Sequence, residues 1–425
     1  MTDSAEKESV SLHAWALLAF MWFAYFLNYC DRQAVFAMFP SLKADLSMSD
    51  AQLGLTGTIF LWVYAFGCPV AGQLADRFSK RMLVVLSLII WSLVTIATGF
   101  ARSATEMLSL RAGMGVSESL FMPTAIALTA AAFPHSQRSR AISVLTTAQI
   151  AGTVGGSWFG GWMADQGEWR HAFQFLGLAG LLFAVPYFLY LRTVEEKAET
   201  RTISAGSGPS LLTMFRVPTY WFLCVAFSVF VFGLWLLYGW FPTFLRDKFL
   251  LNQSDAAFNA TVYLQGSTAI GLLSGGYLAD ALLKVTRASR FWLLTASLLL
   301  CAPCLHLLGS SGTLGATRLA AATFGLFSGL FMGNIFPSAF EVVPMSLRAS
   351  AVGVLNLFGG TVSGFATWFG GTWKATLGID RLMSVTATAY GFAGLLIIVA
   401  IFVSFPGDSH AIQLSEEPAD SPDQE

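Results

Sequence analysis

Long apolar stretches recur along the whole chain, and this feature most limits how the chain can fold. A helix that crosses a bilayer needs roughly 20 mostly apolar residues, and the sequence supplies about twelve such stretches. Only 12% of the residues are charged, whereas soluble domains have about 25%. The sequence therefore predicts an all-α integral membrane protein. The predicted spans lie near residues 13–39, 52–75, 82–101, 106–133, 139–164, 172–191, 217–245, 257–281, 290–309, 314–343, 350–374 and 384–405.

The spans form two halves that resemble each other. Trp158-Phe159-Gly160-Gly161 in the fifth span recurs as Trp368-Phe369-Gly370-Gly371 in the eleventh. Pro134-x3-Arg138 recurs as Pro344-x3-Arg348 at the same separation. A parallel duplication with a ligand site between the halves is typical of secondary transporters. We expect a cytoplasmic N-terminus at 1–12, a six-helix bundle at 13–192, a cytoplasmic linker at 193–216, a second six-helix bundle at 217–405 and a disordered cytoplasmic tail at 406–425.

Basic residues predict the orientation. If the N-terminus is cytoplasmic, the loops and termini on that side carry roughly twice as many Lys and Arg residues as the opposite loops, as the positive-inside rule requires. We therefore expect both termini in the cytoplasm and the protein in the plasma membrane, which is the inner membrane in a bacterium. Lys plus Arg (24) nearly balances Asp plus Glu (25), so nucleic acid is not an expected partner. A single chain suffices, so we expect a monomer.

Two acid–base pairs interrupt the apolar spans. Asp31 and Arg32 lie in the first span, and Arg111 and Glu118 lie in the fourth. Charges within a bilayer-length helix are costly unless they face a partner or a wet cavity, so these residues are functional candidates. Adjacent helical residues point about 100° apart, so at least one of Asp31 and Arg32 should meet the fourth span. We expect the four groups to converge on a shared, hydrated cavity.

These residue types suit the binding of an organic anion coupled to a proton. A guanidinium group can hold a carboxylate with two parallel hydrogen bonds, which makes Arg32 the first candidate for substrate binding and Arg111 the second. Asp31 or Glu118 could take up the proton. Burial favours the protonated form of a carboxyl group, whereas a neighbouring arginine favours the charged form, so a change in the surroundings can switch its protonation. Protonation of Glu118 would release an arginine for the substrate. The alternative is that both pairs are structural salt bridges.

Other polar residues in the spans allow two interpretations. Asn28 and Tyr29 either line the cavity or pack between helices. Tyr238, Asn334 and Asn356 either bind substrate hydroxyls or form interhelical hydrogen bonds. Glu341, at the end of the tenth span, is expected to stabilise its loop.

The loop between the second and third spans has the sequence Gly72-Gln73-Leu74-Ala75-Asp76-Arg77-Phe78-Ser79-Lys80-Arg81. It resembles the inner-loop signature of the major facilitator superfamily, with Ser79 in place of the usual second glycine. The resemblance implies a fold of twelve transmembrane helices in two six-helix pseudo-repeats. It also implies a conformational latch of Gly72, Asp76, Arg77, Lys80 and Arg81, which charges at helix ends can form; a merely solvated basic loop is the alternative. Gly152, Gly155, Gly156, Gly160 and Gly161 resemble the family's glycine-rich helix, where backbones approach closely.

Two shorter motifs indicate which branches of the superfamily the chain resembles. Asn28-Tyr29-x-Asp31-Arg32 and Arg111-x3-Gly115-x2-Glu118 are similar to those of the anion:cation symporters and the neighbouring Spinster-like transporters. The resemblance to the anion:cation symporters implies symport of a small organic anion, such as a sugar acid or other carboxylate, with a proton by alternating access. Sodium is the alternative coupling ion. The resemblance to the Spinster-like transporters implies a transporter of lysolipids or other amphiphiles.

Functions of a different class are a non-transporting receptor and an intramembrane enzyme. The sequence carries no HExxH, GxSxG or P-loop motif, so we expect no enzymatic activity, no cofactor and no metal. Cys301-x2-Cys304 lies within a span, where small packing residues are the simpler interpretation.

Overall fold

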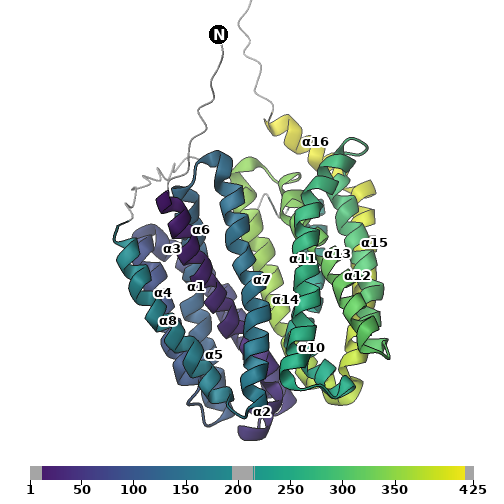
Figure 1. Cartoon of the computed structure of the whole chain (residues 1–425). Coiled ribbons are helices and arrows are strands. Elements are labelled where there is room, and N and C mark those ends of the chain that lie inside the picture. Colours follow the sequence, from purple (N-terminus) through teal and green to yellow (C-terminus); the bar gives the residue numbers. More distant parts are fainter. Residues whose placement is uncertain (1–11, 194–213, 215, 417–425) are drawn as a thin grey trace, which may run out of the picture. The chain divides into compact units, whose positions relative to one another are not determined.

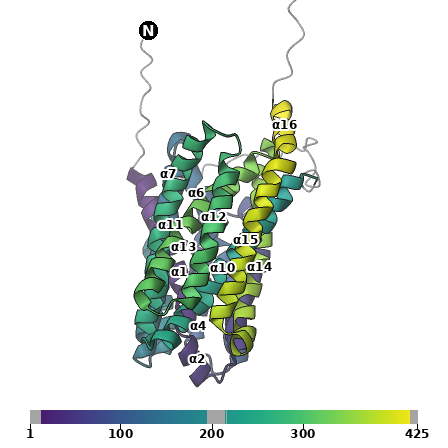
Figure 2. The same cartoon turned by 90° about the vertical axis from the view of Figure 1, so that its right-hand side faces the viewer.

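Helices make up the described part of the chain (Figures 1 and 2). The computed structural model describes residues 12–193, 214 and 216–416. Helices suit a bilayer because they satisfy their main-chain polar groups internally. The first half contains α1 (Leu12–Ala37), α2 (Phe39–Asp45), α3 (Asp50–Arg77), α4 (Lys80–Thr98), α5 (Ala104–Ser119), α6 (Phe121–Ala132), α7 (His135–Asp165) and α8 (Trp169–Leu191). The second half contains α10 (Pro218–Phe249), α11 (Gln253–Leu283), α12 (Ser289–Ser310), α13 (Leu314–Phe340), a 3-10 turn (Met345–Leu347), α14 (Arg348–Leu377), α15 (Ile379–Val403) and α16 (Phe405–Glu416).

The all-helical membrane class is confirmed. Among the described residues, 9 helices are long and apolar enough to cross a membrane: α1, α3, α4, α8, α10, α12, α13, α14 and α15. The fifth and eighth predicted spans correspond to α7 and α11, which have 31 residues each. Both helices contain many Gly, Ser, Thr and Gln residues, which lowers their hydropathy without shortening them.

The fourth predicted span, 106–133, is not one helix. Helix α5 ends at Ser119 and α6 begins at Phe121, and Leu120 between them keeps α-helical dihedral angles (φ −74°, ψ −24°), so a one-residue interruption divides the predicted span. Pro123 gives the physical reason, because its ring removes a main-chain donor and collides with the carbonyl of the residue four positions earlier. The break places Glu118 in the last turn of α5.

Polar residues begin several of the helices. Ser49 accepts a hydrogen bond from the Gln52 main-chain N–H, and the Gln52 side chain accepts one in return from the Ser49 N–H, which is a complete capping box for α3. Ser103 and Thr313 cap α5 and α13 in the simpler way. Ser79, which stands where the signature has glycine, caps α4.

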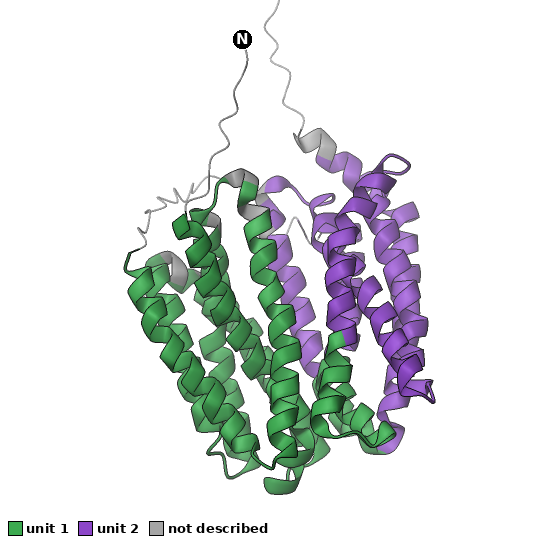
Figure 3. Ribbon diagram, in the orientation of Figure 1, with its two compact units in different colours: residues 1–202, 237–262, 367–375 green, residues 203–236, 263–366, 376–425 purple. Residues whose placement is uncertain are grey.

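The chain divides into two compact units (Figure 3). Unit 1 consists of residues 1–202, 237–262 and 367–375, and unit 2 consists of residues 203–236, 263–366 and 376–425. Unit 1 therefore contains the helices of the first half together with the end of α10, the start of α11 and the last part of α14. The prediction of two bundles divided by the linker stays a prediction, and most of the linker lies outside the described residues.

Glycines bring α1 and α7 together in unit 1. A Cβ atom on Gly152 would lie 2.6 Å from the Phe26 carbonyl oxygen, and one on Gly160 would lie 2.8 Å from the Ala34 carbonyl oxygen. A Cβ on Gly156 would overlap the main chain of Cys30. The expected close approach is thus present at these positions. Gly155 differs, because its nearest neighbours are ring atoms of Phe26 at 3.5 Å.

The core of unit 1 is aromatic. Trp91 of α4 packs edge-on against Phe121 of α6, with ring centroids 5.1 Å apart. Tyr25 of α1 and Tyr187 of α8 belong to the same buried cluster. In unit 2, Phe230 of α10 stacks on Phe331 of α13 at 4.2 Å, and α12 packs against α13 and α15.

The predicted disordered tail is partly helical. Helix α16 covers Phe405–Glu416, where the sequence predicted disorder from residue 406. The Phe405 ring packs against Phe291 of α12 at 4.5 Å, and the Asp408 carboxylate accepts a hydrogen bond from the Thr219 N–H at 3.0 Å. These contacts hold α16 against α10 and α12, although the Pro/Ser-rich composition of the tail predicts disorder. Residues 417–425 lie outside the described part.

The glycine contacts give a stability prediction. Gly156→Ala should lower the free energy of unfolding by about 1–3 kcal/mol, because the new methyl group must push α1 away from α7. The neighbouring Gly155→Ala is the matched control, since its methyl group meets only ordinary contacts. Thermal unfolding of both variants in detergent measures the difference, and equal midpoints would contradict the proposed packing.

Candidate functional site

The buried ion pair between Arg32 and Glu118 is the centre of the site. The Arg32 Nη2 group donates to Glu118 Oε2 at 2.8 Å, which joins α1 to the last turn of α5. The same nitrogen lies 3.4 Å from Asn28 Oδ1, and Arg32 Nη1 lies 3.4 Å from the Tyr29 hydroxyl. Three of the predicted binding residues and one predicted proton carrier therefore meet at one point. The expectation that Asp31 or Arg32 reaches the fourth span holds for Arg32.

Aromatic rings surround the Arg32 guanidinium group. Its central carbon lies 4.6 Å from the Tyr29 ring centroid, 4.7 Å from that of Phe60 and 4.8 Å from that of Tyr64. Phe60 and Tyr64 are one helical turn apart on α3 and present one face to α1. Cation–π contacts favour a planar guanidinium group and fix its orientation.

Asp31 and Arg111 have polar partners other than each other. Asp31 Oδ2 accepts a hydrogen bond from the Thr95 hydroxyl of α4 at 3.2 Å. Arg111 Nε donates to the Thr56 carbonyl of α3 at 3.3 Å, and its Nη1 contacts Met114 Sδ at 3.1 Å. Arg111 also lies over the Phe60 ring, with 4.8 Å between its central carbon and the ring centroid. The Phe60 ring thus contacts both guanidinium groups.

All four ionisable side chains are withdrawn from the surface. Asp31, Arg111 and Glu118 are each 1% exposed and Arg32 is 4% exposed. Arg32 Nε, Asp31 Oδ1 and Arg111 Nη2 have no hydrogen-bond partner among the described residues. A buried polar atom without a hydrogen-bond partner lowers the free energy of unfolding. The Arg32 Nε edge therefore carries a buried donor whose hydrogen bond is not satisfied within the described residues.

The other predicted residues are placed differently. Asn334 of α13, in unit 2, donates to the Gly275 carbonyl of α11 at 3.3 Å, which favours the interhelical interpretation. Asn356 is exposed on α14 in unit 2, and Tyr238 is half-buried in the part of α10 that belongs to unit 1. Glu341 accepts a hydrogen bond from Arg290 at 2.6 Å, as expected for a residue that stabilises its loop.

The sequence analysis missed the partners on α3 and α4. Phe60, Tyr64, Thr56 and Thr95 all contact the charged residues, yet none is charged or unusual within an apolar span. The available signal was the pair of aromatic residues at Phe60 and Tyr64, spaced one turn apart, but 14% of the chain is aromatic. This spacing alone does not distinguish a ring that covers a cation from one that faces lipid.

The predicted latch is only partly described. Gly72 and Asp76 lie in α3, and the surroundings of both residues are outside the described part of the structure. Arg77 is exposed at the end of α3, and Arg81 Nη1 donates to the Leu191 carbonyl at the end of α8 at 3.2 Å. Lys80 also has polar or electrostatic contacts. The latch remains a prediction.

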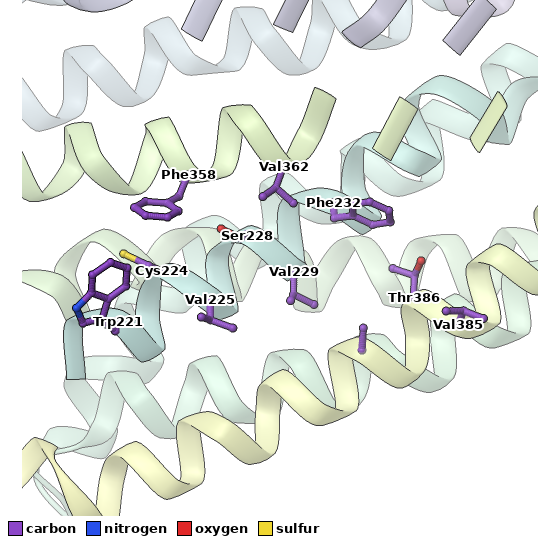
Figure 4. Close-up of a pocket in the computed structure, with 11 residues that line it drawn as sticks. Trp221, Cys224, Val225, Ser228, Val229, Phe232, Phe358, Val362, Val385 and Thr386 are labelled. Carbon is purple, nitrogen blue, oxygen red and sulfur yellow. The ribbon is translucent and has the colours of Figure 1, made fainter. Parts of the chain in front are cut away.

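A separate apolar pocket lies in unit 2, between α10, α14 and α15 (Figure 4). It has a volume of about 350 Å³ and is lined by eleven residues, without a charged one among them: Trp221, Cys224, Val225, Ser228, Val229, Phe232, Phe358, Val362, Val385, Thr386 and Ala389. Such a lining suits a hydrocarbon chain and holds no basic side chain that would pair with a carboxylate.

Comparisons with known proteins agree with this architecture. A model of the Major Facilitator Superfamily matches residues 21–368. The hexuronate transporter of Bacillus subtilis (strain 168) is 27% identical over 355 residues, which cover 79% of this chain and 82% of that protein. A probable galactarate/D-glucarate transporter of the same organism is 26% identical over 403 residues, which cover 85% of each chain.

One solved structure has the same fold over nearly the whole chain. It is the crystal structure of a bacterial homolog to the human lysosomal transporter Spinster, in an inward-facing and unoccupied conformation. The TM-score is 0.77 at 22% identity, and the match covers 97% of this chain and 100% of that chain.

The buried ion pair predicts non-additive stability changes. Arg32→Met or Glu118→Met alone should each cost about 3–5 kcal/mol, because the remaining charge is left without compensation. The double variant should lose less than the sum of the two. Thermal unfolding of the four proteins completes the cycle. The exposed pair of Glu168 and His171 is the control, since its glutamine variants should add with small effects. Additive losses at Arg32 and Glu118 would show that the pair is not coupled.

Proposed function

Because the chain belongs to the Major Facilitator Superfamily and is thus a secondary transporter, we propose that it is a proton-coupled symporter of a small organic anion. The substrate class is a sugar acid or another carboxylate. The transporter works by alternating access, as a monomer in the plasma membrane with both termini in the cytoplasm.

The observation that carries the proposal is the state of Arg32. Its guanidinium group is buried, covered by three aromatic rings and paired with Glu118, while its Nε group has no acceptor among the described residues. A carboxylate can bind the Nε and Nη2 groups in parallel, which is the strongest geometry available to arginine. Since Nη2 is occupied by Glu118, the substrate and Glu118 compete for the same donor. Asn28 and Tyr29 provide further polar contacts for the bound anion.

Competition for Arg32 gives a mechanism of coupling. When Glu118 takes up a proton, its charge is lost and its attraction to Arg32 weakens. The substrate anion then replaces the carboxylate as the partner of the guanidinium group. The buried site never holds the two anions together, so substrate and proton move in the same direction. Asp31 is a second candidate for a proton carrier, because the Glu118 and Arg111 charges both act on it.

Arg111 is the less suitable substrate ligand. Its Nε donates to a main-chain carbonyl within unit 1, whereas the partners of Arg32 are side chains that can rotate away. We propose that Arg111 balances the charge of Asp31 and Glu118. Tyr238, Asn334 and Asn356 remain secondary candidates for substrate contacts, and Gly72, Asp76, Arg77, Lys80 and Arg81 remain the candidate latch.

The relatives suggest which anions to try first. The names of the two Bacillus subtilis relatives specify hexuronate and galactarate or D-glucarate. All three are polyhydroxylated and carry a carboxylate group, two in the case of galactarate and D-glucarate, so Arg32 would hold one carboxylate and polar side chains would contact the hydroxyl groups. D-Glucuronate and D-glucarate are therefore the first test substrates.

The second candidate is a transporter of lysolipids or other amphiphiles. The apolar pocket of unit 2 favours it, since its volume and lining would accept part of an acyl chain. Lysophosphatidylcholine separates the two proposals when it is added to purified protein in a thermal-shift assay. Stabilisation by D-glucuronate but not by the lysolipid supports the organic-anion symporter, and the reverse result supports the amphiphile transporter.

Uptake into proteoliposomes tests the coupling. Glu118→Gln should abolish accumulation of D-glucuronate driven by an inward proton gradient, because the glutamine cannot gain or lose a proton. The same variant should still exchange labelled for unlabelled substrate. Glu106→Gln is the matched control, since Glu106 lies on the same helix but is exposed at its first turn. Gradient-driven accumulation by Glu118→Gln would show that Glu118 is not the coupling residue.

Substrate binding tests the role of Arg32. Arg32→Lys should weaken D-glucuronate binding by more than about 10-fold, because lysine keeps the charge but loses the bidentate geometry and the fit between rings. Arg111→Lys should weaken binding less. Isothermal titration calorimetry on folded variants gives both dissociation constants. An unchanged constant for Arg32→Lys would move the anion site away from Arg32.

A further inference from the structure

A small pocket lies between the first turn of α4 and the last turn of α8, away from the Arg32 site. The two helices belong to unit 1 and pack against each other (Figure 1). Pockets for drug-sized ligands have about 300–1,000 Å³, whereas this pocket has about 250 Å³, which suits one small chemical group of a larger molecule. We call it the α4/α8 pocket. Six residues line it: Ser79, Arg81, Met82, Phe188, Leu191 and Arg192.

One side of the α4/α8 pocket is basic. Arg81 Nη1 donates to the Leu191 carbonyl at 3.2 Å, which joins the start of α4 to the end of α8. Arg192 is exposed, and its guanidinium carbon lies 6.0 Å from the centroid of the Phe188 ring. No carboxylate is among the described residues that line the pocket. Two arginines in one pocket favour an anion, and their planar donor groups match the oxygens of a phosphate.

The other side of the pocket is apolar and continues along both helices. Met82 is 59% exposed and Phe188 is 40% exposed. Further exposed apolar residues follow at intervals of three or four positions, which places them on one face of each helix. They are Leu86, Ile90 and Leu93 on α4 and Leu178, Leu182, Val185 and Leu189 on α8. Extended apolar faces of this kind contact the acyl chains of a bilayer, so the two arginines lie at the end of two lipid-facing surfaces.

Close packing in the middle of α4 and α8 limits the pocket to the helix ends. A Cβ atom on Gly177 of α8 would lie 2.5 Å from the Ser92 carbonyl oxygen of α4. A Cβ atom on Gly180 would overlap the Ser92 side chain. An acyl chain therefore cannot pass between the two helices and has to lie on their outer faces.

We propose that the α4/α8 pocket binds the headgroup phosphate of an anionic phospholipid, such as phosphatidylglycerol, whose acyl chains lie on the exposed faces of α4 and α8. A phospholipid uses both sides of the pocket, whereas a soluble anion would use only the arginines. On the proposed orientation the pocket faces the cytoplasm, where anionic lipids give the membrane surface a negative potential that attracts basic residues. The proposal does not depend on which substrate is transported.

Ser79 contributes a hydroxyl group to the same pocket. The signature of the superfamily has a glycine at this position, and in this chain Ser79 also caps α4. A headgroup held by Arg81, Arg192 and Ser79 connects the first turn of α4 to the last turn of α8, as the Arg81 hydrogen bond already does. Because the lipid binds only the folded protein, it raises the free energy of unfolding.

Native mass spectrometry of the purified protein with added lipid tests the binding. Phosphatidylglycerol should bind at least about 5-fold more tightly than phosphatidylcholine, and Arg192→Gln should weaken phosphatidylglycerol binding by about 5-fold, because one positive charge near the headgroup is lost. Arg102→Gln is the matched control, since Arg102 is exposed in the loop beyond the opposite end of α4, and it should leave binding unchanged. Equal binding of the two lipids, or an equal loss in the two variants, would overturn the proposal.

Substitution of the apolar side tests the acyl-chain contact. Met82→Ser should weaken phosphatidylglycerol binding by at least about 3-fold, since one apolar contact with the chains is lost. Val116→Ser on α5 is the control, because Val116 has a similar exposed fraction of 58% but lies outside the pocket. A dissociation constant that Met82→Ser leaves unchanged would contradict the placement of the acyl chains.

Glycerol phosphate separates a lipid from a soluble anion, because it carries the charged group of phosphatidylglycerol without acyl chains. Thermal unfolding is measured in the native protein and in Arg192→Gln, so that binding elsewhere on the protein is subtracted. The Arg192-dependent rise in the unfolding midpoint should appear with phosphatidylglycerol and be absent with glycerol phosphate. An equal Arg192-dependent rise with glycerol phosphate would show a soluble-anion site and overturn the lipid proposal. These measurements need no transport substrate, so they stay informative if the symporter proposal fails.

Discussion

The ion pair between Arg32 and Glu118 is the interaction on which the rest of the structure depends. Two charges inside a bilayer-length bundle are tolerated only because each compensates the other. Their 2.8 Å separation requires α1 and α5 to lie close together at one depth. The glycines of α7 allow α1 to pack closely against α7, and the interruption before Phe121 places Glu118 in the last turn of α5, which ends at Ser119. Packing and helix termination thus both serve to position one pair.

The sequence predicted the charged residues of the site better than their partners. Charged residues are rare in an apolar span because placing a charge in the bilayer costs free energy. This cost was enough to identify Asp31, Arg32, Arg111 and Glu118. Which of them pair depends on helix rotation, and the spacing only required that Asp31 or Arg32 meet the fourth span. The partner of Asp31 is Thr95, and the rings over Arg32 are Phe60 and Tyr64. Such residues occur throughout a membrane protein, so their role appears only when the helices are placed.

The same distinction applies to the fold. Apolar length predicted the spans, since the bilayer imposes one length on every helix. The break between α5 and α6 was missed because Pro123 is as apolar as its neighbours and interrupts the main chain without changing hydropathy. Helix α16 was missed for the opposite reason, because its polar composition suggests disorder while Asp408 and Phe405 hold it against α10 and α12. Local composition does not predict the structure of a segment whose conformation depends on one residue or one contact.

Helix α3 contacts both the binding pair and Thr367 of α14. Thr58, in contact with Thr367, is two residues from Phe60, which covers both Arg32 and Arg111. On α1, Phe36 is one turn from Arg32, and a Cβ on Gly57 would lie 3.1 Å from the Phe36 ring and 3.0 Å from Thr367. Helices move as rigid segments, so a shift of α3 away from Thr367 also displaces the rings around Arg32. A substrate that changes the partner of Arg32 would act on the same rings, which links occupation of the site to the packing of α3 against Thr367.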